Sequence, residues 1–207
     1  MTGRGMSDRG ETDGAVYVYR LLGNGTLKPK QKLEAEGNAP AGSAGDRLGA
    51  GLAVENGWLL AGAANDQSFP GLTDPHDEDF RFAGKVYIYR LMGRKWDKVQ
   101  ELTSPYSQGN GAFGGRTDAS HIALNEGATL AAIGEPVNRP VFPAEGSVHV
   151  FRRENDKAQQ VDTWELIQTI PAPSDPHLLS LRSRAACSTI AGASRSSRST
   201  GASSRTW

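Results

Sequence analysis

The chain has 207 residues, of which 23 are basic and 23 acidic, so its formal net charge at neutral pH is zero. Its single cysteine, Cys187, excludes a disulfide bond within the chain. No apolar run approaches the length of a membrane-spanning helix, and residues 1–10 lack the apolar core of a signal peptide.

An aromatic strand motif occurs three times along the chain. It reads Gly-Ala-Val-Tyr-Val-Tyr-Arg at 14–20, Gly-Lys-Val-Tyr-Ile-Tyr-Arg at 84–90 and Gly-Ser-Val-His-Val-Phe-Arg at 146–152. Similarity at a roughly constant spacing predicts a repeat architecture. Neither face of the motif is polar, so each copy is expected to be covered on both sides. His149 takes the place of a tyrosine, which favours a packing role over a titrating or ligating one.

Three further strands are expected around each complete copy of the motif. A second strand follows it, at 30–34, 98–102 and 165–170, with the alternating pattern of a half-exposed strand. Two strands precede it, at 48–54 and 58–63 in one copy and within 113–124 and 129–136 in the next, where extra residues around 115–121 predict a bulge or a longer loop. Four-stranded antiparallel units in series predict an all-β fold of the β-propeller kind.

The order of these segments resembles the FG-GAP repeat family, which includes the integrin alpha-subunit propeller and many bacterial extracellular proteins. The pairs Leu48-Gly49 and Phe113-Gly114 are similar to the FG half of the motif, and residues 62–64 and 134–136 to its GAP half. The resemblance covers 14–171 and implies propeller blades. The chain departs from the motif by having Leu48 for phenylalanine, Ala64 for proline and Glu135 for alanine.

The expected organisation is a partial propeller. It consists of a half blade at 14–35 and two full blades at about 46–103 and 111–170, preceded by a remnant loop or disordered segment at 1–13. Because propellers close with four to eight blades, we expect a piece of a larger protein. Unpaired strand edges at its ends would then favour self-association.

Residues 174–207 differ in composition from the rest of the chain. They contain ten serines, five arginines and one acidic residue, Asp175, which leaves a charge of −4 on the remainder. This tail is expected to be either the product of a shifted reading frame or a natural disordered segment. Nucleic-acid binding is not expected, because the arginines are scattered and no aromatic residue lies among them before Trp207.

An acidic cluster lies in the long loop at 65–83. The candidate contacts for a partner are this cluster and the aspartate near the start of the loop: Asp66, Asp74, His76, Asp77, Glu78 and Asp79. A solvated loop is the alternative interpretation, and Asp74, Asp77 and Asp79 are weak metal candidates, because their spacing matches no known metal signature. The turns at 55–57 and 125–127 lack the Asp-rich calcium loop of the family, so no cofactor is expected there.

The resemblance implies a non-catalytic interaction or adhesion scaffold at an extracellular or cell-surface location. Its ligand would be a protein or a glycan, contacted by the loops at 65–83, 103–112 and 137–145. Asp118 and His121 lie close in sequence, with Ser120 beside them, but without a nucleophile motif they predict no catalysis. Two alternatives stay open: a propeller that accompanies a hydrolase domain outside this chain, and a carbohydrate-binding propeller that uses Trp58, Trp96 or Trp164.

Overall fold

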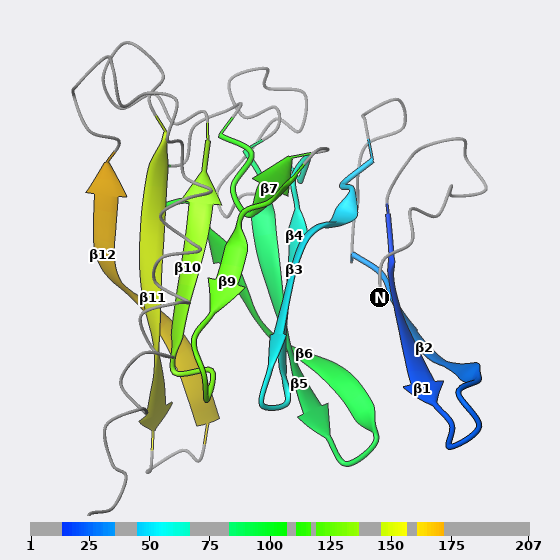
Figure 1. Cartoon of the computed structure of the whole chain (residues 1–207). Coiled ribbons are helices and arrows are strands. Elements are labelled where there is room, and N and C mark those ends of the chain that lie inside the picture. Colours follow the sequence, from blue (N-terminus) through cyan, green and yellow to red (C-terminus); the bar gives the residue numbers. More distant parts are fainter. Residues whose placement is uncertain are drawn as a thin grey trace, which may run out of the picture.

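The computed structural model describes residues 14–35, 45–66, 83–106, 111–116, 119–136, 146–156 and 161–171. Throughout these ranges the chain forms strands, turns and extended segments, with no helix. Consequently, none of the described segments is a helix that could cross a membrane. The strands pair with their sequence neighbours in antiparallel fashion and form separate sheets that stand side by side (Figure 1). The expected all-β class is confirmed, and the described sheets form an open stack.

Three units make up this stack. Unit 1 is the hairpin of β1 (Val16–Leu21) and β2 (Leu27–Leu33). Unit 2 has the order β3 (Leu48–Glu55), β4 (Trp58–Ala63), β5 (Lys85–Met92) and β6 (Lys95–Thr103). Unit 3 has the order β9 (Ile122–Leu124), β10 (Leu130–Glu135), β11 (Ser147–Asp156) and β12 (Val161–Pro171). The two four-stranded units that the sequence predicts are therefore present.

The extra residues before β9 form a small hairpin of their own. β7 (Gly115–Arg116) pairs with β8 (Ala119–Ser120) outside the four-stranded sheet. The expected bulge or longer loop is thus a two-stranded excursion. The Ser120 hydroxyl holds it to unit 2, because its oxygen accepts a hydrogen bond from the Leu52 backbone N–H at 3.1 Å.

The three copies of the aromatic motif share one strand register. Val16 lies opposite Leu33, Val86 opposite Leu102 and Val148 opposite Ile170. In each copy the register shifts at the same place, after Val18, Ile88 and Val150, so each outer strand carries an equivalent β-bulge. A bulge increases the local twist and bends its strand. The repeat seen in the sequence is therefore also a repeat of backbone geometry.

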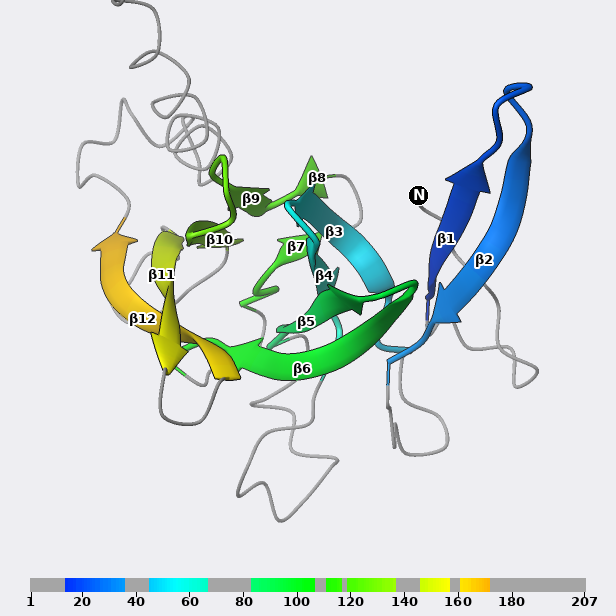
Figure 2. The same cartoon turned by 90° about the horizontal axis from the view of Figure 1, so that it is seen from below.

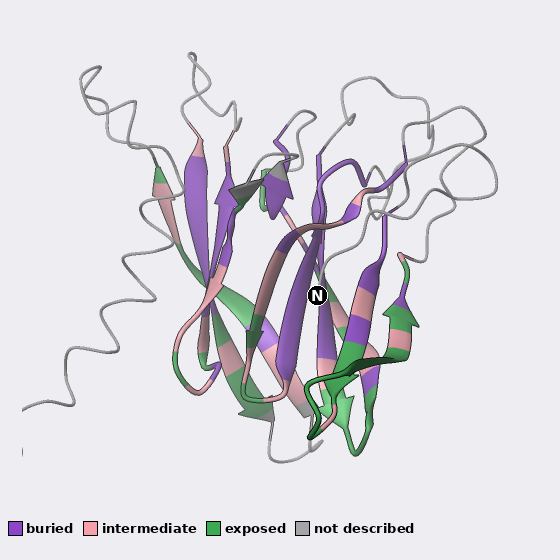
Figure 3. Ribbon diagram, turned by 45° about the vertical axis from the view of Figure 1, so that its right-hand side comes forward, coloured by how far each residue is buried: buried purple, intermediate pink, exposed green. Residues whose placement is uncertain are grey.

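Two apolar cores separate the three units. Val16, Val18 and Leu33 of unit 1 belong to one core, together with residues of β3, β4, β5 and β6. The opposite face of unit 2 shares the second core with unit 3, where Phe113 is fully buried. Figure 2 looks from below: β3 and β9 lie toward one side of the stack, and β6 and β12 toward the other. The buried residues follow the middle strands in Figure 3, and the exposed ones gather on β2, β6 and β12.

Glycines allow units 2 and 3 to approach closely. A Cβ at Gly62 would lie 2.3 Å from the backbone oxygen of Gly114, and a Cβ at Gly51 would lie 2.2 Å from the same oxygen. Real side chains cannot occupy such positions, so the corner at Phe113-Gly114 in unit 3 fits against two strands of unit 2 only because both residues lack a side chain. Gly51 and Gly62 thus act as packing residues between units 2 and 3.

Candidate functional site

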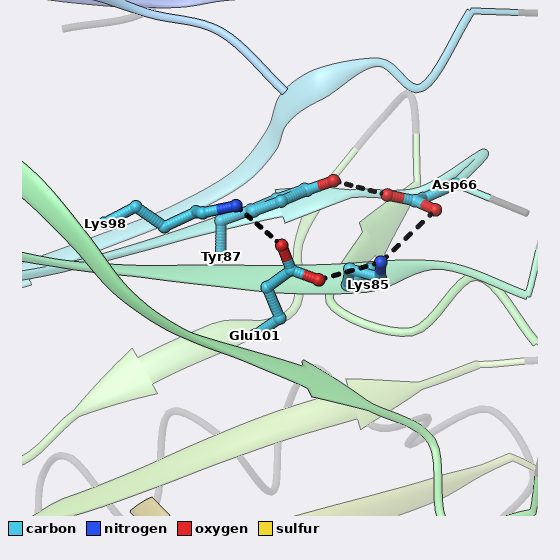
Figure 4. Close-up of polar contacts among 5 residues, drawn as sticks. All are labelled: Asp66, Lys85, Tyr87, Lys98 and Glu101. Carbon is cyan, nitrogen blue, oxygen red and sulfur yellow. Dashed lines mark hydrogen bonds and ion pairs between the residues drawn. The ribbon is translucent and has the colours of Figure 1, made fainter. Parts of the chain in front are cut away.

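A polar cluster at the end of β4 supports the base of the acidic loop. Asp66 is the one sequence-predicted contact residue within the described ranges, and it is 2% exposed. The Tyr87 hydroxyl donates a hydrogen bond to Asp66 Oδ2 at 2.7 Å, and Lys85 Nζ lies 3.8 Å from Asp66 Oδ1 (Figure 4). The Asp66 carboxylate therefore belongs to the base of the loop, inside the protein.

Glu101 extends this cluster onto the outer strand β6. Its two carboxylate oxygens accept hydrogen bonds from Lys85 Nζ at 2.9 Å and from Lys98 Nζ at 2.8 Å. Partial burial alone would raise the pKa of Glu101, but the hydrogen bonds and charges of the two lysines outweigh it and hold that pKa below its ordinary value. Two carboxylates and two ammonium groups therefore compensate one another around Tyr87.

Tyr87 is held in its neutral form by the same surroundings. Burial raises the pKa of its hydroxyl, and the charge of Asp66 and the hydrogen bond to it raise the pKa further. Two cations also lie near the ring, with Lys98 Nζ 5.5 Å and Lys85 Nζ 5.7 Å from its centroid. Tyr87 is accordingly a hydrogen-bond donor that fixes Asp66, and it is poorly suited to act as a base or nucleophile.

The backbone also closes the base of the loop. The N–H of Gly84 donates to the carbonyl of Asp66 at 3.1 Å, so the residues that flank 67–82 are joined directly. Asn65 is bonded in the same region, from its N–H to the Asp46 carbonyl at 3.1 Å and from its side chain to the Gly45 carbonyl at 3.2 Å. The acidic loop therefore starts and ends at a well-supported point. Asp74, His76, Asp77, Glu78 and Asp79 themselves lie outside the described residues.

Unit 3 has a second polar cluster at the equivalent strand positions. Ser147, His149 and Thr169 take the places of Lys85, Tyr87 and Glu101 in the strand register. His149 Nε2 lies 2.9 Å from Glu135 Oε2 and 3.0 Å from Ser147 Oγ, while Nδ1 lies 3.0 Å from Thr169 Oγ1. The tyrosine-to-histidine change thus comes with a different set of partners.

The composition of this cluster suggests hydrolytic chemistry, but its geometry does not. In a serine hydrolase the nucleophile and the carboxylate contact opposite nitrogens of the histidine ring. Here Ser147 and Glu135 both lie at Nε2. Moreover, His149 and Glu135 are fully buried, out of reach of a substrate. The arrangement is that of a buried structural network.

A residue of unit 2 and an aromatic ring of unit 3 complete the second cluster. Ser104, which follows β6 of unit 2, donates from its hydroxyl to Glu135 Oε2 at 2.8 Å. The His149 ring packs against Phe113, with 5.6 Å between ring centroids. The expected packing role of His149 is confirmed, and the polar role adds to it. Glu135 was not recognised as its partner, although a glutamate that ends the apolar run 130–134 is a signal for a buried ion or hydrogen-bond network.

The other sequence candidates are placed as follows. His121 is 7% exposed, and Asp118 lies outside the described residues. The part of the chain that the structure describes brings no three potential metal ligands together. Trp58, Trp96 and Trp164 are all buried in the cores, so their rings are closed to sugars. Trp58 contacts Trp164 edge to face across units 2 and 3, with 5.6 Å between ring centroids.

Comparison with known proteins found no match, either among protein-family models or among curated proteins.

Proposed function

We propose that this chain is a segment of an FG-GAP β-propeller that works as a non-catalytic binding scaffold, with the acidic loop at 65–83 as its main contact surface. The observation that carries the proposal is the double closure of the loop base by the backbone bond from Gly84 to Asp66 and the side-chain bond from Tyr87 to Asp66. Binding residues in proteins are often found on loops that a rigid framework positions.

The repeated packing of the units supports the scaffold part of this proposal. Two extensive apolar cores and an equivalent bulge in every outer strand give a framework that changes little from unit to unit. In unit 2 the charges of the polar cluster compensate one another, and in unit 3 His149 and Glu135 are buried, so both clusters contribute to this framework. Neither of them presents a nucleophile to solvent, which favours binding over catalysis.

The charge of the loop suggests the chemistry of its partner. Asp74, Asp77, Glu78 and Asp79 place four carboxylates within six residues. At the base of the loop, by contrast, the carboxylate of Asp66 is compensated by Lys85. Complementary charge favours association with a basic surface, so the partner we propose is a protein with exposed lysine or arginine residues.

Selection of peptides from a random phage-displayed library against the intact protein tests this function. We expect enrichment of basic sequences, whose binding is lost in a quadruple variant with Asp74→Asn, Asp77→Asn, Glu78→Gln and Asp79→Asn. The matched control removes the same four charges elsewhere, with Glu34→Gln, Glu55→Gln, Glu154→Gln and Glu165→Gln, and should retain binding. Equal binding by both variants would refute the loop as the contact surface, and a glycan-array signal without any basic peptide would favour the carbohydrate alternative.

A further inference from the structure

A glutamine side chain joins the outer strands of neighbouring units, and it does so twice. Gln31 of β2 donates from Nε2 to the Trp96 carbonyl at 2.8 Å and accepts at Oε1 from the Trp96 N–H at 2.9 Å. Gln100 of β6 makes the same pair of bonds with the backbone of Trp164, at 2.9 and 2.8 Å. One amide thus occupies both backbone groups of the tryptophan in the outer strand of the next unit. We call this arrangement the glutamine clasp.

Unit 3 carries the same glutamine at the same register position. Val18 lies opposite Gln31, Ile88 opposite Gln100, and Val150 opposite Gln168. Gln168 is exposed, whereas the first two glutamines are partly buried. Within the described ranges, the small apolar cluster on this side of the sheet contains residues of unit 3 alone, and its Ala132 and Val148 are 1% and 3% exposed, so the open part of this face is the outer strand around Gln168. Gln168 is therefore a clasp donor with no unit opposite it among the described residues.

Unit 1 carries a matching acceptor at the other end of the stack. Trp96 and Trp164 each precede the glutamine of their own strand by four residues, and the residue four before Gln31 is Leu27. Leu27 lies opposite Leu21 as Trp96 lies opposite Leu91, so its backbone has the register of a clasp acceptor. Its side chain is 59% exposed.

Tyr19 shows the same contrast beside Leu27. It has the strand position of Tyr89 and Phe151, which are 3% and 4% exposed inside the stack, yet Tyr19 itself is 41% exposed. Apolar groups that are buried at each internal interface are thus left in solvent at this end.

We propose that a second copy of this chain docks head to tail, with Gln168 of one copy clasping the Leu27 backbone of the other beneath Tyr19. The new interface continues the two interfaces that already exist within the chain. Unit 1 contributes two described strands, β1 and β2, so the contact is smaller than the internal ones. Two copies of three units give six units, a number within the range at which propellers close, and two identical contacts would then form a ring.

Sedimentation equilibrium of the full chain over a concentration series tests this proposal. The expected dimer has twice the 22.1 kDa mass of the chain. Gln168→Ala removes both amide bonds and should weaken the dimer by about tenfold or more. Leu27→Trp installs the residue present at both internal interfaces and should tighten it.

Gln100→Ala is the matched control, because it makes the same substitution at an internal clasp and should leave the dimerisation constant unchanged. The proposal is independent of the acidic loop, so the quadruple loop variant should dimerise normally. A protein that stays monomeric at all concentrations would overturn it, as would a dimer that neither Gln168→Ala nor Leu27→Trp affects. A chain that dimerises only after removal of residues 174–207 would also overturn it, since the tail would then be the occupant of this face.

Discussion

Replacement of Gly62 by alanine tests the close packing of units 2 and 3 most directly. The added Cβ would lie 2.3 Å from the Gly114 carbonyl oxygen and 2.9 Å from its carbon, and both are backbone atoms without rotamer freedom. Ordinary van der Waals contact begins at 3.4 Å, so the two sheets must separate by about 1 Å at this point.

The cost of this separation follows from what surrounds the glycine. Gly62 lies beside the core that Leu60, Val86 and Ile133 fill, and those contacts would loosen together with the glycine contact. Overpacking in a core of this kind costs about 3 kcal/mol when the neighbour cannot rotate away. Gly62→Ala should therefore lower the free energy of unfolding by about that amount.

Urea unfolding followed by tryptophan fluorescence measures the effect. Trp58 and Trp164 lie in the core between units 2 and 3, and Trp96 lies in the core between units 1 and 2, so both interfaces are reported. The control is Gly23→Ala, where the new Cβ meets nothing within 4 Å, and the change should be neutral or stabilising by about 0.5 kcal/mol. Equal stabilities of the two variants would refute the assignment of Gly62 as a contact glycine.

Three further predictions concern the polar contacts. Gln100→Ala should lower the unfolding free energy by about 2 kcal/mol through loss of an internal clasp. Gln168→Ala, at the exposed equivalent position in β12, should leave the unfolding free energy of the monomer unchanged. The urea midpoints of the two variants check this. Glu101 has a lower pKa when folded, so it stabilises the fold above its ordinary pKa of about 4.3, and this contribution is lost as the pH falls through the folded value. Glu101→Gln should therefore cost at most about 1 kcal/mol at neutral pH, and this cost should shrink as the pH is lowered through the folded pKa. Glu135→Ala should cost about 3 kcal/mol, because it leaves a buried histidine and a buried serine without their shared acceptor, and an unchanged melting temperature would contradict the buried network.

The units were predictable because their signals are local. Asn56-Gly57 between two apolar runs specifies a tight hairpin, and the turn has the expected positive φ values of 45° and 75°. Repetition of the aromatic motif adds a second, independent indication, since three copies with one pattern are expected to share one register. The structure confirms this even in the position of the bulge.

The contacts between units were not predictable in the same way. Gln100 and Trp164 are 64 residues apart, and nothing in an alternating outer strand distinguishes a glutamine that faces water from one that reaches a neighbouring backbone. In the sequence, Glu135 stands out only as a departure from the GAP motif. Its role depends on a histidine 14 residues later and on Ser104 from another sheet, which are brought together only when the units stack.

The two polar clusters also bear on how a repeat protein avoids pairing the wrong strands as it folds. Similar units can exchange strands, which is a characteristic misfolding route of repeat proteins. If β5 took the place of β11 beside β12, Lys85 would lose Glu101 as a partner, since Thr169 stands at that register position. If β11 took the place of β5, Glu101 would lose Lys85 and gain a serine in its place. Either exchange thus breaks the ion pair between Lys85 and Glu101, so the clusters help to distinguish strands whose apolar residues are nearly interchangeable.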